Sequence, residues 1–311
     1  MKDFTHYTVM KNEAVDALNC KDGLIYVDCT LGGGGHSELI LQRISPNGKL
    51  ISFDIDQDAI DAASERLKAY KNLTIVKDSY TNVKQVLKNL GIEKITGGIL
   101  FDLGASYHQL TKQERGFSFS KEAPLDMRFN MDSNFSAYDV VNDYSGDELV
   151  KIFSEYGEER FSKRIAKKIV EQRKIKKLET TTELADLIVN CTPKVKSHIH
   201  PATRVFQAIR IEVNHELQNV KNTLNDVLDL LDFGAIISVI SFHSLEDRLV
   251  KQTFKYYSTR CHCERNQMVC NCPPPVIELV NKKPMMASEE EIKENPPSRS
   301  AKLRIARCIR K

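Results

Sequence analysis

The glycine-rich segment YVDCTLGGGGH, at residues 26–36, holds the residue types best suited to bind a ligand. Its four consecutive glycines follow an apolar run, and a second apolar run, ISFDID, carries Asp54 about twenty residues further on. Glycines let the backbone turn tightly against a ligand, and a carboxylate at the end of the second strand can accept hydrogen bonds from both hydroxyls of a ribose. The pattern predicts a site for an adenosine-containing cofactor. A flexible turn between two core strands is the alternative, but it does not account for an acidic residue at this distance.

A second group of polar residues follows a later apolar run, in the sequence ILFDLGASYHQL. Ligands of open α/β sheets bind outside the carboxyl ends of the strands, so Asp102 should face the same crevice as Gly34 and Asp54. A nicotinamide enzyme would also place residues there. Two details favour methyl transfer: Ser37 stands where the dinucleotide pattern has its third glycine, and no histidine with a paired carboxylate and arginine suggests hydride transfer.

Apolar runs and helical patterns alternate along much of the chain, as a parallel sheet with crossover helices requires. We expect strands at 24–28, 50–55, 73–76, 99–103 and 235–240, with a last strand in KLRIARCIR, and helices at 37–44, 58–70, 82–90 and 245–257. Between about 110 and 220 amphipathic helical patterns occur without a convincing strand. The predicted fold class is therefore α/β, with a Rossmann-like domain at 1–109 and 221–311 and an inserted helical domain at 110–220.

Basic residues are concentrated in two places, although the net charge of the 311 residues is only +3. Residues 160–177 contain nine basic residues and one acidic residue, and residues 298–311 contain six basic residues and no acidic one. Such patches are typical of proteins that bind a polyanion. A solvated helix face is the alternative for either patch taken alone.

No run of residues is long and apolar enough for a membrane helix, and the first residues lack the apolar core of a signal peptide. We therefore expect a cytosolic protein whose eight cysteines are reduced. Four of them form a C-x-C-x6-C-x-C pattern: Cys261, Cys263, Cys270 and Cys272. Four thiolates could bind zinc, but the C-x-C spacing is tighter than that of a usual zinc knuckle. The spacing favours a reduced loop, so no metal is expected, while zinc binding stays an alternative.

Several longer sequence blocks are specific enough to compare with known families: HYTVM, DCTLGGGGHS, DLGASYHQL, RGFSF, PLDMRFN, TRVFQAIRIEVNHEL, SFHSLEDRLVK and NPPSRSAKLR. Together they resemble the bacterial 16S ribosomal RNA cytosine-N4 methyltransferase family, the MraW/RsmH type, over nearly the whole chain. The resemblance implies an S-adenosylmethionine-dependent enzyme with a Rossmann-like class I methyltransferase sheet and an inserted helical domain. The implied substrate is the N4 amine of one cytidine in the decoding region of 16S rRNA, position 1402 in standard rRNA numbering. The implied partner is 16S rRNA within the small ribosomal subunit, in the cytoplasm and away from membranes, and a homodimer stays open.

The resemblance also implies which residues contact the cofactor: Gly34, Gly35, His36, Asp54, Tyr80, Asp102 and Gln109. Tyr80 stands where the family often has phenylalanine, and either ring can lie against adenine. The chain departs from the family pattern in the loop after the fourth strand, at Ala105, Tyr107, His108 and Thr111, and again at Asn130. The loss of the usual proline from that loop makes the positions of Ser106 and Gln109 less certain.

Asp102 is the candidate catalytic residue. The lone pair of the cytosine N4 is delocalised into the ring, so the amine is a poor nucleophile until a hydrogen-bond acceptor polarises it. Amino-methyltransferases supply such an acceptor at the end of the fourth strand. Most of the acceleration should come from positioning the two reactants and excluding water.

The predicted helical insert should hold the RNA after the target base leaves its stack. The candidate RNA contacts are Arg115, Arg128, Lys163, Arg164, Lys167, Lys168, Arg204, Arg210 and, after the fifth strand, His243. Core packing is the favoured role for Phe117 and Phe119. Histidine and acidic residues also occur together in NHEL and in SFHSLEDR, but their spacing does not match a metal site. A catalytically inactive RNA-binding assembly factor is a further alternative, prompted by the altered loop at 105–108.

Overall fold

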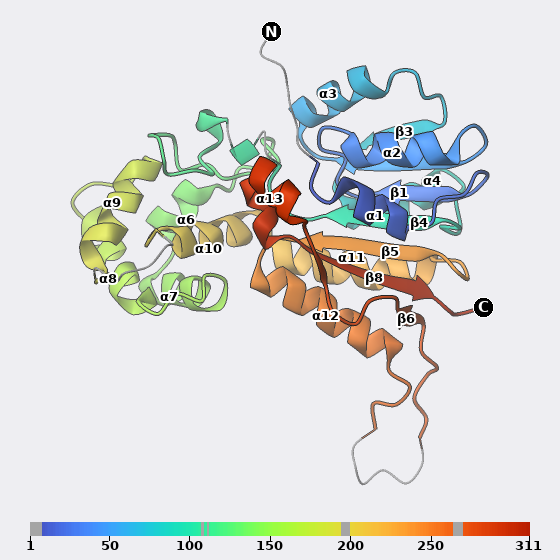
Figure 1. Cartoon of the computed structure of the whole chain (residues 1–311). Helices are drawn as coiled ribbons and strands as arrows, with labels where there is room; N and C mark the ends of the chain where they lie inside the picture. Colours follow the sequence, from blue (N-terminus) through green and yellow to red (C-terminus); the bar gives the residue numbers. More distant parts are fainter. Residues whose placement is uncertain (1–7, 107–108, 111, 194–199, 264–269) are drawn as a thin grey trace. The chain divides into compact units, whose positions relative to one another are not determined.

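The computed structural model describes residues 8–106, 109–110, 112–193, 200–263 and 270–311. They form two compact units (Figure 1). The first contains residues up to Gly104 together with Leu217–Lys311, and the second is Ala105–Glu216. The sequence placed these boundaries after residues 109 and 220. Within the described residues, no helix combines the length and the apolar character that a membrane span needs.

The first unit is built on an eight-stranded sheet with the order β3-β2-β1-β4-β5-β8-β6, and β7 also pairs with β8. The strands are β1 (Ile25–Asp28), β2 (Lys49–Asp54), β3 (Leu73–Lys77), β4 (Gly98–Asp102), β5 (Ile236–Ser241), β6 (Ile277–Leu279), β7 (Met285–Met286) and β8 (Lys302–Cys308). β1 to β5 are parallel, and β8 is antiparallel to β5. Strand order reverses between β1 and β4, which is where ligands of doubly wound sheets bind. The predicted α/β fold class is confirmed.

Helices cover both faces of this sheet (Figure 1). One apolar core includes residues of α1 (Lys11–Ala17), α2 (Gly35–Ile44) and α3 (Gln57–Leu67), and the other includes residues of α4 (Val83–Asn89), α11 (Glu216–Leu230) and α12 (Ser244–Ser258). In β4, Ile99 and Phe101 belong to the second core and Leu100 to the first, because successive strand side chains point to opposite faces. A strand buried on both faces therefore has a continuous apolar sequence. The short helices are η1 (Tyr80–Asn82), α13 (Glu289–Glu294) and η3 (Pro296–Ser300).

The second unit is helical, with one isolated bridge between Pro124 and Thr180 and no strand among its described residues. Its helices are η2 (Gln113–Arg115), α6 (Ala137–Asp143), α7 (Gly146–Glu155), α8 (Ser162–Arg173), α9 (Thr181–Cys191) and α10 (Thr203–Asn214). α6, α7 and α9 each begin with a capping box, in which a serine or threonine and an acidic residue three positions later satisfy free backbone amides. The apolar faces of the helices in this unit form a separate core that includes Phe153, Ile165 and Leu184.

Candidate active site

The loop between β1 and α2 contains the glycine-rich segment, and its backbone explains why glycines stand there. Gly32 and Gly34 have φ angles of 49° and 77°, in the left-handed region that favours glycine, and Gly34 is the N-cap of α2. At Gly35 a Cβ atom would lie 1.8 Å from Oγ1 of Thr8. The segment before α1 therefore packs directly on the start of α2, which only a residue without a side chain permits.

Asp54 ends β2 and holds this loop in place. Its Oδ2 accepts a hydrogen bond from the amide of Gly32 at 2.8 Å, and its Oδ1 accepts one from the amide of Asp56 at 2.9 Å. Burial raises the pKa of Asp54 to about 6. A carboxylate offers about four acceptor positions. The half-buried Asp54, which accepts hydrogen bonds from two backbone amides, can therefore still accept hydrogen bonds from two ribose hydroxyls. The residue thus fits the adenosine-containing cofactor expected from the sequence.

Asp28, at the end of β1, was not singled out from the sequence. It is fully buried, and its Oδ2 accepts a 2.7 Å hydrogen bond from the hydroxyl of Ser37, which lies 2.9 Å from the hydroxyl of Ser52. Its Oδ1 accepts from the amide of Thr30 at 3.1 Å, and the Thr30 hydroxyl accepts from the amide of Asp102 at 2.7 Å. This network joins the loops after β1 and β4. The available signal was an acidic residue inside an apolar strand sequence.

Asp102, at the end of β4, has an unsatisfied carboxyl oxygen. Its Oδ1 is shielded from solvent and lacks a hydrogen-bond partner among the described residues, although the side chain as a whole is 19% exposed. Burial, followed by the negative charges of Asp28, Glu246 and Glu291, raises its pKa well above the usual range. An isolated buried acceptor is unfavourable unless a ligand supplies a donor. Asp102 is therefore the group in this crevice most in need of a bound partner.

His36 lies beside Asp102 and is only 3% exposed. Its Nε2 is 3.1 Å from the carbonyl oxygen of Val9, which can only accept, so Nε2 carries a proton in this geometry. Its Nδ1 lies 3.8 Å from Oδ2 of Asp102, too far for a hydrogen bond. His36 thus fixes the segment before α1 against the glycine loop, and its expected contact with the cofactor stays a prediction.

Two other predicted residues lie at the ends of strands of the first unit. Tyr80 follows β3 and packs edge-on against Phe101, with ring centroids 5.9 Å apart, so its ring is held beside the core while the residue stays half-buried. His243 follows β5 and is the N-cap of α12, where its Nδ1 accepts from the amide of Glu246 at 3.4 Å. The Glu246 carboxylate accepts in return from the amide of Phe242 at 2.9 Å. Helix capping accounts for Nδ1 of His243, whose Nε2 lies 3.1 Å from Oε1 of Glu246. A contact of His243 with RNA stays a prediction.

In the second unit, two arginines predicted to bind RNA instead stabilise the backbone. Arg115 is 4% exposed, and its Nη2 donates to the carbonyl oxygens of Arg128 and Phe129, both at 3.0 Å. Arg128 forms a bidentate ion pair with Asp126, in which Nε donates to Oδ1 at 3.0 Å and Nη2 donates to Oδ2 at 2.6 Å. Neither guanidinium is presented as a phosphate ligand in this structure, because Arg115 is buried and Arg128 is paired with Asp126.

The remaining predicted residues of this unit divide into buried and exposed groups. Gln109 is buried and bonded to Ser106, with its Oε1 2.9 Å from the Ser106 amide. Arg210 pairs with Glu216 at 2.8 and 2.9 Å. The exposed basic residues are Lys163, Arg164, Lys167 and Lys168 on α8, and Arg204 on α10. A cofactor contact by Gln109 stays a prediction.

The aromatic and variable positions of this unit also have defined places. Phe117 is buried and Phe119 packs against Phe206, so the core role expected for both phenylalanines is confirmed. Asn130 is exposed, and its side-chain oxygen accepts from the amide of Asp132 at 2.9 Å. The expected departures at Tyr107, His108 and Thr111 lie outside the described residues.

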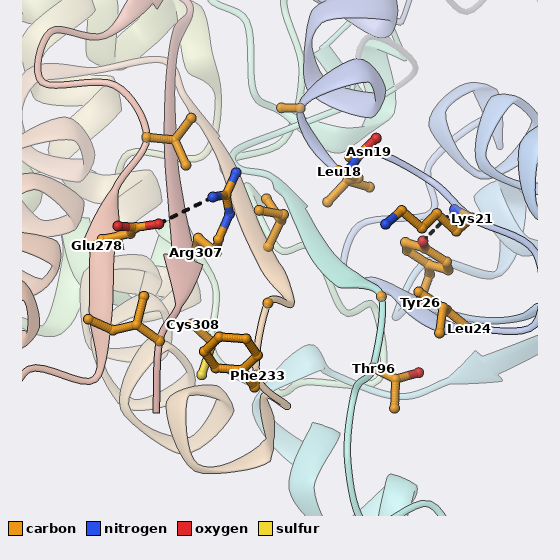
Figure 2. A pocket seen from close by; sticks show the side chains of 16 residues that line it. Leu18, Asn19, Lys21, Leu24, Tyr26, Thr96, Phe233, Glu278, Arg307 and Cys308 are labelled. Atoms are coloured by element: carbon orange, nitrogen blue, oxygen red, sulfur yellow. Dashed lines mark hydrogen bonds and ion pairs between the residues drawn. The ribbon is translucent and has the colours of Figure 1, made fainter. Parts of the chain in front are cut away.

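A pocket of about 540 Å³ opens at the opposite ends of the strands, beside the amino ends of β1, β4 and β5 (Figure 2). Tyr26, whose hydroxyl accepts from the amide of Lys21 at 2.8 Å, lines one part of it, and the Glu278–Arg307 ion pair lines another. Asp28, Asp54 and Asp102, at the carboxyl ends of the strands, are not part of its lining. Ligands of parallel sheets bind at the carboxyl ends of the strands. We therefore assign the chemistry to the carboxyl ends and not to this pocket.

The sequence is similar to known proteins along nearly its whole length. Residues 3–309 match the MraW methylase family. The curated relative "Ribosomal RNA small subunit methyltransferase H" from Clostridioides difficile (strain 630) is 48% identical over 312 residues, covering 99% of this chain and 100% of the relative. The protein of the same name from Caldicellulosiruptor bescii is 52% identical over 307 residues, covering 98% and 100%.

Solved structures are more distant. An rRNA methylase from Streptococcus thermophilus has a TM-score of 0.43 at 11% identity, covering 96% of this chain and 95% of its own. An S-adenosylmethionine-dependent O-methyltransferase from Thermotoga maritima has a TM-score of 0.43 at 8% identity, covering 100% and 69%. Likeness at this level carries no argument, so the assignment rests on the sequence matches. They decide against the nicotinamide oxidoreductase considered above. The chain belongs to the MraW methylase family and is an S-adenosylmethionine-dependent methyltransferase.

Proposed function

We propose that the protein methylates the N4 amine of one cytidine in the decoding region of 16S rRNA, acting in the cytoplasm on the small ribosomal subunit. Its curated relatives, named as small-subunit rRNA methyltransferases, support an rRNA substrate, because they are about half identical over nearly the full chain. The choice of base and position rests on the resemblance of the sequence blocks to the cytosine-N4 family. The chemistry depends most on one observation, the unsatisfied Oδ1 of Asp102.

In this proposal Asp102 accepts a hydrogen bond from the N4 amine of the target base. That bond holds the amine in one orientation and increases the electron density on N4. In its ionised form Asp102 can also take the proton that N4 loses once it carries the new methyl group. The acceleration from aligning the two reactants adds to this effect.

The loop after β1 and the end of β2 would hold the cofactor. S-Adenosylmethionine, when bound, supplies an electrophilic methyl group. Asp54 would accept from the ribose hydroxyls, Gly34 and Gly35 would let the backbone approach the ligand, and the ring of Tyr80 would lie against the adenine. The hydrogen bonds from the backbone amides of Gly32 and Asp56 keep the Asp54 carboxylate in one orientation before the ligand binds, which lowers the entropic cost of binding.

The exposed basic residues of the second unit would bind the RNA backbone. On α8, Ile165 and Ile169 are fully buried while Lys163, Arg164 and Lys167 are exposed, so one helix face packs in the core and the other carries positive charge. Arg204 on α10 is also exposed. Arg115 and Arg128 are left out of this proposed surface because Arg115 is buried and Arg128 is paired with Asp126.

The test is transfer of labelled methyl groups to small subunits from cells lacking this modification, followed by mapping of the modified nucleoside. The proposal expects N4-methylcytidine at one decoding-region position. For Asp102→Asn, turnover at saturating cofactor should fall by about 10²- to 10⁴-fold, the usual contribution of a positioned acid or base. Asp226→Asn, which changes a half-buried carboxylate of α11 outside the site, is the matched control.

The same assay separates the alternatives. If Asp102→Asn weakens cofactor binding but keeps normal turnover at saturation, Asp102 is a cofactor ligand and not the catalytic acceptor. If the cofactor binds but neither subunits nor free rRNA are methylated, the protein acts as an RNA-binding factor and the proposal is wrong. Methylation of another base would retain the enzyme class and refute the substrate.

A further inference from the structure

Four cysteine thiols come together in the segment between α12 and β6. The Sγ atoms of Cys261, Cys263, Cys270 and Cys272 all lie within 4.8 Å of one another. The Sγ atoms of Cys263 and Cys272 are 3.5 Å apart, and those of Cys261 and Cys270 are 3.6 Å apart. A zinc ion with four sulfurs at about 2.3 Å in a tetrahedron places those sulfurs about 3.8 Å from each other. The four thiols therefore already have nearly the spacing of a zinc site.

No apolar core holds these thiols together. Among the described residues from Thr259 to Val276 none is buried, and the first buried side chain after them is Ile277. Closing a loop costs conformational entropy, and thiol–thiol contacts are too weak to offset that cost. A bound metal ion supplies enough free energy to fix such a loop without a core.

The surroundings of the thiols also suit thiolate ligands. The amide of His262 donates to Sγ of Cys272 at 3.2 Å, and the amide of Cys263 donates to Sγ of Cys261 at 3.5 Å. Such hydrogen bonds orient metal ligands and stabilise their charge. The imidazole of His262 stacks on Tyr256 of α12, with ring centroids 4.2 Å apart, so the first arm of the loop is anchored on the helix.

The geometry also explains why the spacing alone disfavoured a metal. A usual zinc knuckle takes two ligands from one turn with two to four residues between them, and C-x-C is tighter. Here each C-x-C arm contributes two sulfurs, and the tetrahedron is completed across the two arms, by pairing Cys261 with Cys270 and Cys263 with Cys272. The sequence gives the spacing within an arm, but only the fold shows that the arms face each other.

We propose that Cys261, Cys263, Cys270 and Cys272 bind one zinc ion as a structural tetrathiolate site. Because the protein supplies all four ligands, no position is open for water or substrate, so the site fixes structure and does not catalyse. It closes the segment between α12 and β6, whose base is joined by the bond from the Val276 amide to the Tyr257 carbonyl at 2.9 Å. The described arms of this segment, residues 259–263 and 270–276, extend away from the sheet in Figure 1.

The test uses the full chain, purified under reducing conditions from zinc-supplemented cells. Elemental analysis should find about one zinc per chain. The reduced, metal-stripped chain should bind one equivalent of Co²⁺ and show the intense thiolate-to-cobalt absorption and the visible bands of a tetrahedral site. Cys263→Ser combined with Cys272→Ser should abolish both signals. Cys20→Ser, a half-buried cysteine outside the cluster, is the control and should retain them.

Three results would overturn the proposal: substoichiometric zinc together with no tetrahedral cobalt spectrum for the reduced wild-type chain, iron in place of zinc, or disulfides linking Cys261 to Cys270 and Cys263 to Cys272 in freshly isolated protein. The cobalt titration of the wild-type chain needs no variant, so poor folding of the double substitution would leave the test intact.

Discussion

The raised pKa of Asp54 predicts that cofactor affinity depends on pH in a range where an ordinary aspartate would have no effect. The carboxylate accepts hydrogen bonds from ribose hydroxyls most strongly when ionised. With a pKa of about 6, against 3.8 for an unperturbed aspartate, it is roughly nine-tenths ionised at pH 7 and one-tenth ionised at pH 5. The affinity for S-adenosylhomocysteine should therefore fall about tenfold from pH 7 to pH 5, which corresponds to about 1.4 kcal/mol.

Isothermal titration calorimetry at several pH values measures this directly, with thermal melts at each pH to confirm that the chain stays folded. Asp54→Asn should bind weakly at pH 7, because the introduced amide cannot accept as a carboxylate does, and should lose most of the pH dependence. Any remaining dependence would belong to other carboxyl groups near these strand ends, such as Asp28 and Asp102, whose pKa values burial also raises. Equal wild-type affinities at pH 5 and pH 7, or a full tenfold decrease in the variant, would refute the assignment of the ribose contact to Asp54.

Three further variants separate binding from stability. Lys163→Ala and Arg164→Ala together should weaken rRNA binding and reduce its salt dependence by about one phosphate contact per residue, with the melting temperature almost unchanged; an unchanged salt slope would exclude this face of α8. Arg115→Ala should destabilise the fold by about 1–3 kcal/mol in urea unfolding, because two partly buried carbonyl oxygens lose their donor. Ser37→Ala should also lower stability by about 1–3 kcal/mol, because it leaves the buried carboxyl group of Asp28 with one fewer donor, and a neutral effect would mean that water replaces the hydroxyl.

The free energy of unfolding should also depend on the ionisation of Asp54, and the raised pKa determines the direction of that dependence. The folded chain holds a proton on Asp54 at a higher pH than the unfolded chain does, since its pKa rises from 3.8 to about 6 on folding. The contribution of Asp54 to stability is therefore greatest below pH 4 and decreases as the pH rises toward 6. Urea unfolding of the wild type and of Asp54→Asn between pH 4 and pH 7 should show a smaller loss of stability in the variant. An equal loss in both chains would contradict this.

The fold was predictable because its central strands are buried on both faces. β4 appears as an apolar run and β5 as one interrupted only by Ser238, and the glycines after β1 mark the turn to α2. The sequence missed β6 and β7, which have three and two residues and pair only with β8. Segments this short have no periodicity of their own, and their pairing depends on contacts distant in sequence.

The position of a site residue was predictable where its type goes with the end of an apolar run: Asp54 does end β2, and its contact with the cofactor stays a prediction. The role of a residue was not predictable where it depends on which carbonyl or amide comes near. Arg115 has the sequence context of a phosphate ligand, yet it is buried and its Nη2 donates to the carbonyl oxygens of Arg128 and Phe129. In α8, by contrast, the helical period itself separates the buried isoleucines from the exposed lysines, so the charged face could be recognised.

The three acidic residues that end β1, β2 and β4 show how the fold assigns different tasks to one residue type. Asp28 is fully buried and accepts from a hydroxyl and an amide, so it can only stabilise the loops around it. Asp54 accepts from two amides but is half-buried, so it keeps acceptor positions for a ligand while its orientation is fixed. Asp102 has an oxygen that no described residue satisfies. Since a buried acceptor without a donor destabilises the folded state, Asp102 gains most from a bound partner, which is why we infer that the reacting amine binds there.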